Sequence, residues 1–173
     1  MRVELASLDG KTCRFAHDYG PGELALDDER VAIAVPPEVS GRITRAERKV
    51  VVEGKLVAVA KVECDRCLGP VTVPINTEFS VEYVTLETYR TTEIAELGEE
   101  DLALSVFEGE FIDVDEILRE QLLLAVPTHV ICREDCKGLC PMCGEDRNLS
   151  NCDCKTTEID PRWAGLEELV NGK

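Results

Sequence analysis

The chain has 173 residues, 44% of them hydrophobic and only 5% aromatic, which fits one domain with an aliphatic core or one domain plus a small appendage. No apolar run reaches the roughly 18 residues that span a bilayer, and the start lacks a signal-peptide pattern, so we expect a cytoplasmic protein without a membrane partner. The net charge of −16 argues against a simple nucleic-acid binder, because phosphate contacts need clustered Lys and Arg; it fits a basic protein partner, or solubility alone.

The first half of the chain has the pattern of short β-strands. Residues 31–35 are apolar and are followed by Pro36-Pro37, where we expect the strand to stop. Residues 50–62 are rich in β-branched and apolar side chains, and polar and apolar residues alternate over 71–75 and again over 79–83. Short strands joined by brief polar turns predict an antiparallel β-rich sheet or half-barrel.

The clearest helix is predicted from Asp113 to Val126. Asp113 is a suitable N-cap, with Glu116 placed to complete a capping box, and Pro127 ends the helix. Its apolar face at helical spacing consists of Val114, Ile117, Leu118, Leu122 and Ala125. A second short helix is predicted to begin at Asp160-Pro161.

These elements predict an α+β protein in two parts. Residues 1–127 would form a β-rich domain that ends in the core helix. Residues 128–173 would form a cysteine-rich zinc module with a C-terminal helix, packed on the first part rather than independent. The region from Leu86 to Glu120 is strongly acidic, and its stretch 87–101 has no clear periodicity, so we expect it to be a surface excursion.

The nine cysteines are the most informative feature of the composition. In a reducing compartment such a pattern indicates metal binding or redox chemistry rather than structural disulfides. Cys64 and Cys67 form one C-x-x-C motif, and Cys140 and Cys143 form a second, which Gly144 follows. Two thiolates on a tight turn can face one ion, and a glycine after the second Cys allows the positive φ that such turns favour.

Eight of the cysteines divide into two sets of four, the number that structural zinc takes. The first set would join the end of the helix to the β-region, and the second set is local. The two expected sites are Cys64, Cys67, Cys132 and Cys136, and Cys140, Cys143, Cys152 and Cys154.

Three alternatives to this division remain open at the level of sequence. A single zinc could be held by the two C-x-x-C motifs, as in a zinc ribbon. Cys64 and Cys67 could be a redox pair, or His129 could replace Cys132 as a ligand. Cys13 has no partner by spacing, and we expect it to be a buried, small apolar side chain.

Motifs for catalysis are absent from the sequence. It contains neither G-x-x-x-x-G-K-[ST] nor G-x-G-x-x-G, and its two histidines, His17 and His129, form no recognisable nucleophile–base arrangement. A four-sulfur zinc site leaves no position for a catalytic water. We therefore expect a protein that is not an enzyme and has no small-molecule substrate.

The segment 136–144, Cys-Lys-Gly-Leu-Cys-Pro-Met-Cys-Gly, resembles the YceD family of large ribosomal RNA subunit accumulation proteins. The knuckle 64–68, the run 120–124, Asn148-Leu149 and the stretch 160–162 match in the same order. The resemblance implies a bacterial cytosolic protein needed for 23S ribosomal RNA accumulation and large-subunit assembly, without established enzymatic activity. A neighbouring gene in the family encodes a small zinc-ribbon protein of the large subunit, which implies a basic ribosomal protein, or a pre-ribosomal particle, as partner.

Two classes of function follow from the sequence. One is an assembly factor that binds a basic protein. The other is a direct rRNA binder that uses a basic strip, which could equally be a set of solvent-facing strand positions balanced by the acidic region. The strip consists of Arg42, Arg45, Arg48, Lys49, Lys55 and Arg66. A redox enzyme is a third class.

Overall fold

The computed structural model describes residues 1–4, 8, 12–46, 49–86, 89, 104–107, 111–154 and 162. The chain forms two compact units: Met1–Glu63 with Pro70–Val130, and Cys64–Gly69 with Ile131–Lys173. Three features predicted from the sequence lie outside the described residues. They are Arg48, the acidic stretch 87–101 apart from Tyr89, and the helix that would begin at Asp160 apart from Arg162.

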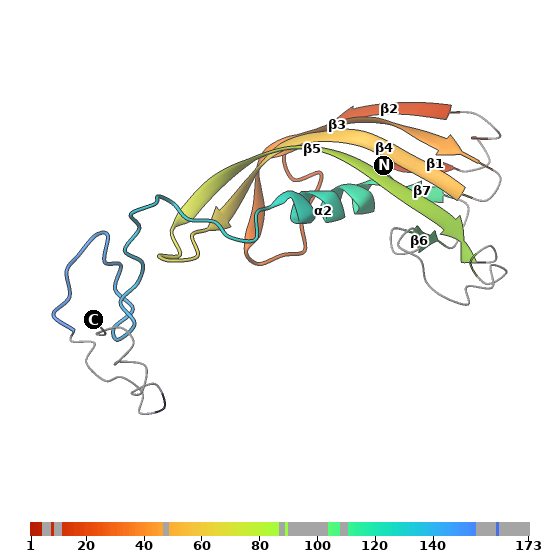
Figure 1. Ribbon diagram of the computed structural model, residues 1–173. Helices are drawn as coiled ribbons and strands as arrows, with labels where there is room; N and C mark the ends of the chain where they lie inside the picture. Colours follow the sequence, from red (N-terminus) through yellow and green to blue (C-terminus); the bar gives the residue numbers. More distant parts are fainter. Residues whose placement is uncertain are drawn as a thin grey trace. The chain divides into compact units, whose positions relative to one another are not determined.

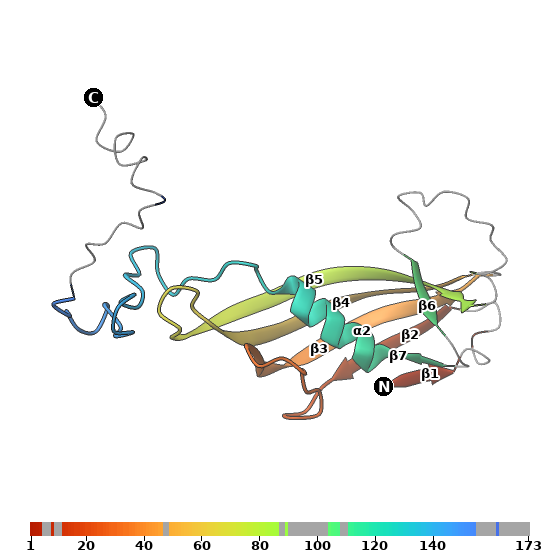
Figure 2. The same ribbon diagram turned by 90° about the horizontal axis from the view of Figure 1, so that it is seen from below.

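The first unit is built on a five-stranded sheet with a smaller two-stranded sheet beside it (Figures 1 and 2). The large sheet has the order β2-β3-β4-β5-β6, with β2 Thr12–Asp18, β3 Val31–Arg45, β4 Lys49–Glu63, β5 Pro70–Thr85 and β6 Leu104–Phe107. The small sheet pairs β1 (Arg2–Glu4) with β7 (Phe111–Asp113). All of these pairs are antiparallel except β5 with β6, so the predicted β-rich α+β fold is confirmed, with one parallel pair added.

Strand β3 continues through Pro36 and Pro37, so the prediction that these prolines end the strand is wrong. The register between β3 and β4 shifts between Val35 and Glu38. A bulge leaves residues out of the hydrogen-bonded ladder, so the missing N–H of each proline costs no ladder bond. The carbonyl of Pro37 instead accepts a hydrogen bond from the Tyr19 N–H at 3.0 Å.

Helix α2, Val114–Ala125, lies across the concave face of the large sheet (Figures 1 and 2). Asp113 is its N-cap, as predicted, and the Asp113 carboxylate accepts a hydrogen bond from the Asp115 N–H at 3.1 Å. The predicted apolar face supplies the buried residues Val114, Ile117, Leu118 and Leu122. Each fully buried aliphatic side chain stabilises the fold by roughly 1.5–3 kcal/mol. Among the described residues, no helix is long and apolar enough to cross a membrane.

A row of aromatic and glycine residues crosses four strands of the large sheet. Phe15 pairs with Gly41 and Gly54 pairs with Phe79, while the two glycines face each other across β3 and β4. A Cβ atom on Gly54 would lie 2.7 Å from the Phe79 ring, and one on Gly41 would lie 2.7 Å from the Phe15 ring. The rings therefore occupy the space that side chains at the glycines would need, which requires glycine at both positions.

Candidate metal centre

The turn Cys64–Gly69 connects β4 to β5 and carries the first C-x-x-C motif. The Cys64 N–H donates to the Gly69 carbonyl at 2.8 Å, and the Leu68 N–H donates to the Cys64 carbonyl at 2.9 Å. Leu68 has a φ of 59°, the left-handed conformation that glycine adopts more readily than residues with a Cβ. The turn brings both sulfurs of the motif to one side of the loop.

The second C-x-x-C motif forms a turn with the same pair of hydrogen bonds. The Cys140 N–H donates to the Glu145 carbonyl at 2.8 Å, and the Gly144 N–H donates to the Cys140 carbonyl at 2.8 Å. Gly144, which the sequence placed at the position that favours positive φ, has a φ of 76°. The two motifs are therefore local copies of one backbone structure, although one has leucine where the other has glycine.

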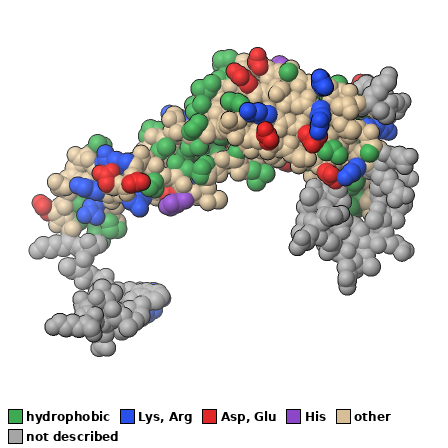
Figure 3. Space-filling model, turned by 45° about the horizontal axis from the view of Figure 1, so that its top comes forward, with side chains coloured by type: hydrophobic (Ala, Val, Ile, Leu, Met, Phe, Trp, Pro, Cys, Tyr) green, Lys and Arg blue, Asp and Glu red, His purple; other side chains and the backbone are tan. Residues whose placement is uncertain are grey.

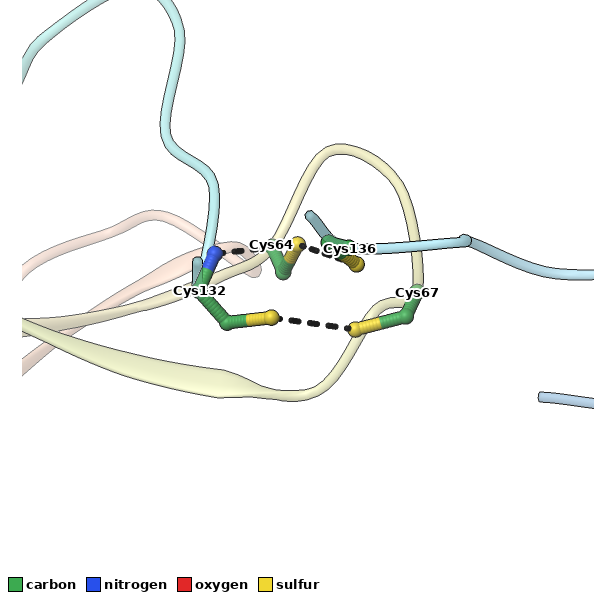
Figure 4. Close-up of side chains that lie close together, drawn as sticks. All are labelled: Cys64, Cys67, Cys132 and Cys136. Carbon is green, nitrogen blue, oxygen red and sulfur yellow. Dashed lines mark hydrogen bonds between the residues drawn. The ribbon is translucent and has the colours of Figure 1, made fainter. Parts of the chain in front are cut away.

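Four cysteines of the second unit form the first tetrad: Cys64 and Cys67 on the turn, and Cys132 and Cys136 on the segment after the helix (Figure 4). Their sulfurs lie within 4.8 Å of one another. The Cys64–Cys136 and Cys67–Cys132 sulfur distances are 3.9 and 3.8 Å. A tetrahedral zinc with bonds of about 2.3 Å requires sulfurs about 3.8 Å apart, whereas a disulfide requires about 2.05 Å. This spacing fits a four-thiolate metal site.

Backbone N–H groups surround the sulfur of Cys64. The amides of Cys132 and Arg66 lie 3.3 and 3.5 Å from it. Hydrogen bonding from the backbone N–H of Cys67, assisted by these two amides, lowers the pKa of the Cys64 thiol to about 6. The site is therefore prepared to hold a thiolate.

The pKa values of the other cysteines in the first tetrad depend on their neighbours. Burial opposes ionisation of Cys136, but the Gly138 N–H and the Asn148 side chain outweigh it, so the pKa of Cys136 is lowered. The thiol of Cys132 hydrogen-bonds to Cys136, which with burial raises the pKa of Cys132 to about 12. Without a cation some of these thiols keep their protons, and a bound cation would favour the thiolate at each of them.

The second tetrad consists of Cys140, Cys143, Cys152 and Cys154, whose sulfurs also lie within 4.8 Å of one another. The backbone N–H groups of Cys143 and Met142 lower the pKa of Cys140 to about 6. The thiol of Cys154 hydrogen-bonds to Cys143, which raises the pKa of Cys154 to about 12. Like the first tetrad, this one combines an amide-stabilised thiolate with thiols that a cation would deprotonate.

Arg66 connects the turn of the first motif to the segment that follows the helix. Its guanidinium Nη1 donates to the carbonyls of Glu134 and Cys136 at 3.2 and 3.0 Å. Its own carbonyl accepts from the Leu139 N–H at 3.0 Å. Gly138 lies against this carbonyl with a φ of 68°, and a Cβ there would be 2.9 Å from the Arg66 oxygen. The sequence suggested Arg66 as an RNA contact, but in the structure this side chain bonds to the backbone that carries Cys136.

Asn148 lies near the first tetrad, and its role there was not predicted from the sequence. Its Nδ2 donates to the Cys136 sulfur at 3.5 Å and to Asp146 Oδ1 at 2.6 Å. Its Oδ1 accepts from the Lys137 N–H at 2.9 Å and from the Arg133 guanidinium at 2.8 Å. Groups that hold the ligands in this way tune metal affinity. The available signal in the sequence was an amide side chain in a short loop between two ligand pairs.

The structure groups the cysteines in the same two sets that the spacing favoured, rather than placing both C-x-x-C motifs around one point. Among the described residues, neither tetrad includes His129. Cys13, expected to be buried, is exposed, so that prediction is wrong. Cys13 lies on β2 opposite Ile43 of β3, and among the described strands β2 pairs with β3 alone, so Cys13 stands at the edge of the sheet rather than in the core.

In the first unit, the described residues of the predicted basic strip lie on both faces of the large sheet, and two of them are paired with carboxylates. Arg42 pairs with Glu53 at 2.7 Å, and Lys49 pairs with Glu82 at 2.9 Å. Arg45 is three positions from Arg42 on β3 and therefore projects from the opposite face of the sheet.

Of the remaining strip residues, Lys55 is exposed on β4, Arg66 belongs to the second unit, and Arg48 lies outside the described residues. Side chains of both charges are interspersed on the surface seen in Figure 3. The strip residues described in the first unit are therefore interspersed with carboxylates, and an RNA-binding role for the strip stays a prediction.

Comparisons with known proteins identify related chains. An uncharacterized protein of Mycobacterium tuberculosis (strain ATCC 25618 / H37Rv) is 31% identical over 156 residues, which cover 89% of this chain and 72% of that protein. The uncharacterized protein YlbN of Bacillus subtilis (strain 168) is 29% identical over 136 residues, 78% of this chain and 74% of YlbN. The chloroplastic large ribosomal RNA subunit accumulation protein YCED homolog 1 of Arabidopsis thaliana is 26% identical over 156 residues, 78% of this chain and 48% of the plant protein. No solved structure matches the chain.

A family model described as large ribosomal RNA subunit accumulation protein YceD matches residues 52–170. This range contains both C-x-x-C turns and all eight cysteines of the two tetrads. It also contains Asn148 and Arg66, which hold the first tetrad together. The chain therefore belongs to the YceD family of large ribosomal RNA subunit accumulation proteins.

Proposed function

We propose that this chain is a non-enzymatic, zinc-stabilised factor that supports 23S ribosomal RNA accumulation and large-subunit assembly by binding a basic ribosomal protein. A pre-ribosomal particle that contains such a protein is an equivalent partner. The observation that carries the proposal is the family match over residues 52–170, which contains both cysteine tetrads. The family description supports a role in ribosomal RNA accumulation, and the charge and cysteine chemistry of the chain support action through binding a basic protein.

Zinc is the metal that the donor set favours. Thiolate ligands in a tetrahedral arrangement select zinc or iron–sulfur clusters, and the sulfur spacing of 3.8–3.9 Å corresponds to a single tetrahedral ion. The eight cysteines that would bind it are Cys64, Cys67, Cys132, Cys136, Cys140, Cys143, Cys152 and Cys154. Such ions contribute to folding free energy, because the ligands converge only in the folded chain. Free thiols in this number fit a reducing compartment, and we place the protein in the cytoplasm.

A closed four-sulfur site supports a structural role rather than catalysis. With all four positions taken by thiolates, zinc has no site for the water or substrate that a catalytic metal binds. The ions would instead fix the two turns and the segment after the helix in one arrangement. The chain then acts through its surfaces.

The charge of the chain supports a protein partner over direct RNA binding. The net charge is −16, and two of the predicted RNA contacts, Arg42 and Lys49, are paired with carboxylates. A third, Arg66, has its guanidinium bonded to backbone carbonyls. An RNA phosphate would have to displace these partners as well as overcome the repulsion of the acidic chain.

The proposal is tested by deleting the gene in the organism that carries it and measuring the ratio of 23S to 16S ribosomal RNA. We expect the ratio to fall on deletion and to recover with the wild-type gene. A variant in which Cys140 and Cys143 are replaced by Ser should not restore it, whereas replacement of the exposed Cys13 should restore it fully. An unchanged ratio on deletion would contradict the proposed function.

A further inference from the structure

A groove lies in the first unit where the edge strands of the two sheets approach helix α2. It has a volume of about 450 Å³. Three elements contribute to its lining: β6, β7 and α2 at Glu116 and Glu120, with Tyr83 of β5 behind them. Among the described strands, β6 pairs only with β5 and β7 pairs only with β1, so each has one edge without a partner strand.

The lining of the groove combines exposed apolar side chains with carboxylates. Val106 and Phe111 are 41% and 45% exposed, so the groove offers apolar surface to a ligand. Glu116 and Glu120 lie one turn apart on the exposed side of α2, and neither has an ion-pair partner among the described residues. Like charges at this spacing destabilise a helix, and a basic ligand between the two carboxylates would relieve their repulsion. Burial, together with Glu120 and Glu116, raises the pKa of Tyr83 to about 12.

The chain itself shows how this surface holds a cation. The guanidinium of Arg2 lies over the Phe111 ring, with its carbon 4.9 Å from the ring centroid. The same guanidinium donates to the Asp113 carboxylate at 3.1 Å. One end of the groove therefore already holds an arginine between an aromatic ring and a carboxylate. Glu116 and Glu120, with Tyr83 and Phe107 beside them, present the same combination of groups farther along the groove, and no described cation pairs with them.

We propose that this groove binds an extended, basic segment of a partner protein. Glu116 and Glu120 would pair with two Arg or Lys side chains, while the segment's backbone pairs with the edge of β6 that no described strand occupies and its apolar side chains contact Val106 and Phe111. Four helical residues rise about 6 Å. Alternate residues of a strand are about 6.7 Å apart, so basic residues at every second position match the two carboxylates.

A protein segment fits this groove better than RNA does. The described charges that line it are the carboxylates of Asp113, Glu116 and Glu120, which repel phosphates. The inference rests on the proposed function, since it gives the basic partner of that proposal a place to bind. It concerns the first unit alone and makes no use of the cysteine tetrads.

The test uses the zinc-loaded full chain and a fluorescein-labelled dodecapeptide in which Arg alternates with Thr. Fluorescence anisotropy gives the dissociation constant at about 0.1 M salt. We expect E116Q/E120Q to weaken binding at least fivefold. The matched control is E38Q/E78Q, which removes the same charge from exposed positions on the large sheet and should change binding less than twofold.

If both double variants weaken peptide binding equally, the peptide is attracted by net charge only, and the proposal that the groove is its binding site is overturned. Tighter binding of a 12-nucleotide single-stranded RNA that E116Q/E120Q leaves unchanged would overturn it in favour of RNA. In cells, E116Q/E120Q should fail to restore the 23S to 16S ratio. If deletion lowers the ratio but this variant restores it and the peptide does not bind, the groove is wrong while the proposed function stands.

Discussion

Replacing Gly138 by Ala should weaken zinc binding at the first tetrad. The free-energy cost has two parts, one from backbone conformation and one from a steric contact. Gly138 has a φ of 68°, and a residue with a Cβ in this left-handed conformation costs about 1–2 kcal/mol. In addition, the new Cβ would lie 2.9 Å from the Arg66 carbonyl oxygen, which accepts the Leu139 N–H. Overpacking of this kind costs about 1–3 kcal/mol.

The matched control is Gly144→Ala. Gly144 has a similar φ of 76°, but nothing lies within 4 Å of where its Cβ would be. This variant therefore carries the conformational cost without the contact. Relative to wild type, the loss of zinc affinity at the first tetrad in Gly138→Ala should exceed the loss at the second tetrad in Gly144→Ala by about 1–3 kcal/mol, or roughly 5- to 140-fold. Competition with a chelator, with zinc release followed as the chelator concentration rises, measures the difference. Equal losses in the two variants would refute the role assigned to the contact between Gly138 and Arg66.

Three further predictions concern the tetrads and the sheet. Asn148→Ala should lower zinc affinity at the first tetrad about 10- to 100-fold in the same competition assay, because the Cys136 sulfur loses the N–H donor that Asn148 supplies. An unchanged affinity would contradict the role of Asn148 in holding this ligand. Zinc affinity should rise between pH 6 and pH 8 by about tenfold per pH unit for each proton displaced, because the raised pKa values of Cys132 and Cys154 keep these thiols protonated without metal. Calorimetry in buffers of different ionisation enthalpy should detect the released protons. An affinity that does not change with pH would argue against proton release on zinc binding. Gly54→Ala should lower the free energy of unfolding by about 1–3 kcal/mol without loss of zinc, since its Cβ would meet the Phe79 ring at 2.7 Å; a denaturant titration that matches wild type would disprove the packing argument.

The spacing of the cysteines allowed the two tetrads to be predicted as sets. The second set is local, within residues 140–154, so sequence separation alone limits its arrangement. The first set depends on a long-range approach of Cys132 to Cys64. The sequence favoured this approach because each of two cysteine pairs needed two more ligands to complete a four-cysteine site. One pair is the C-x-x-C turn between two strands, and the other follows the helix.

The strands were predictable where alternation was clear, as in β4, whose even-numbered side chains are mostly buried. The continuation of β3 through Pro36 and Pro37 was not, because it depends on a bulge opposite β4. From local sequence preference alone, two consecutive prolines predict the end of a strand.

The roles of individual polar side chains were the least predictable. Arg66 looked like one of several surface cations, yet its partners are carbonyls about 70 residues away in the chain. Arg42 and Lys49 are neutralised by Glu53 and Glu82 through strand register, which no local pattern reveals. The predicted basic strip came from sequence proximity, whereas charge on a sheet is arranged by face and by cross-strand neighbours.

The measurement that tests the account most directly is the metal content and sulfur coordination of protein purified without added metal. Elemental analysis should find two zinc ions per chain. X-ray absorption at the zinc edge should find four sulfur ligands at about 2.3 Å for each ion, as expected for two separate four-cysteine sites. One zinc per chain, or coordination by nitrogen or oxygen, would contradict the division of the eight cysteines, and absence of zinc would contradict the metal-stabilised fold altogether.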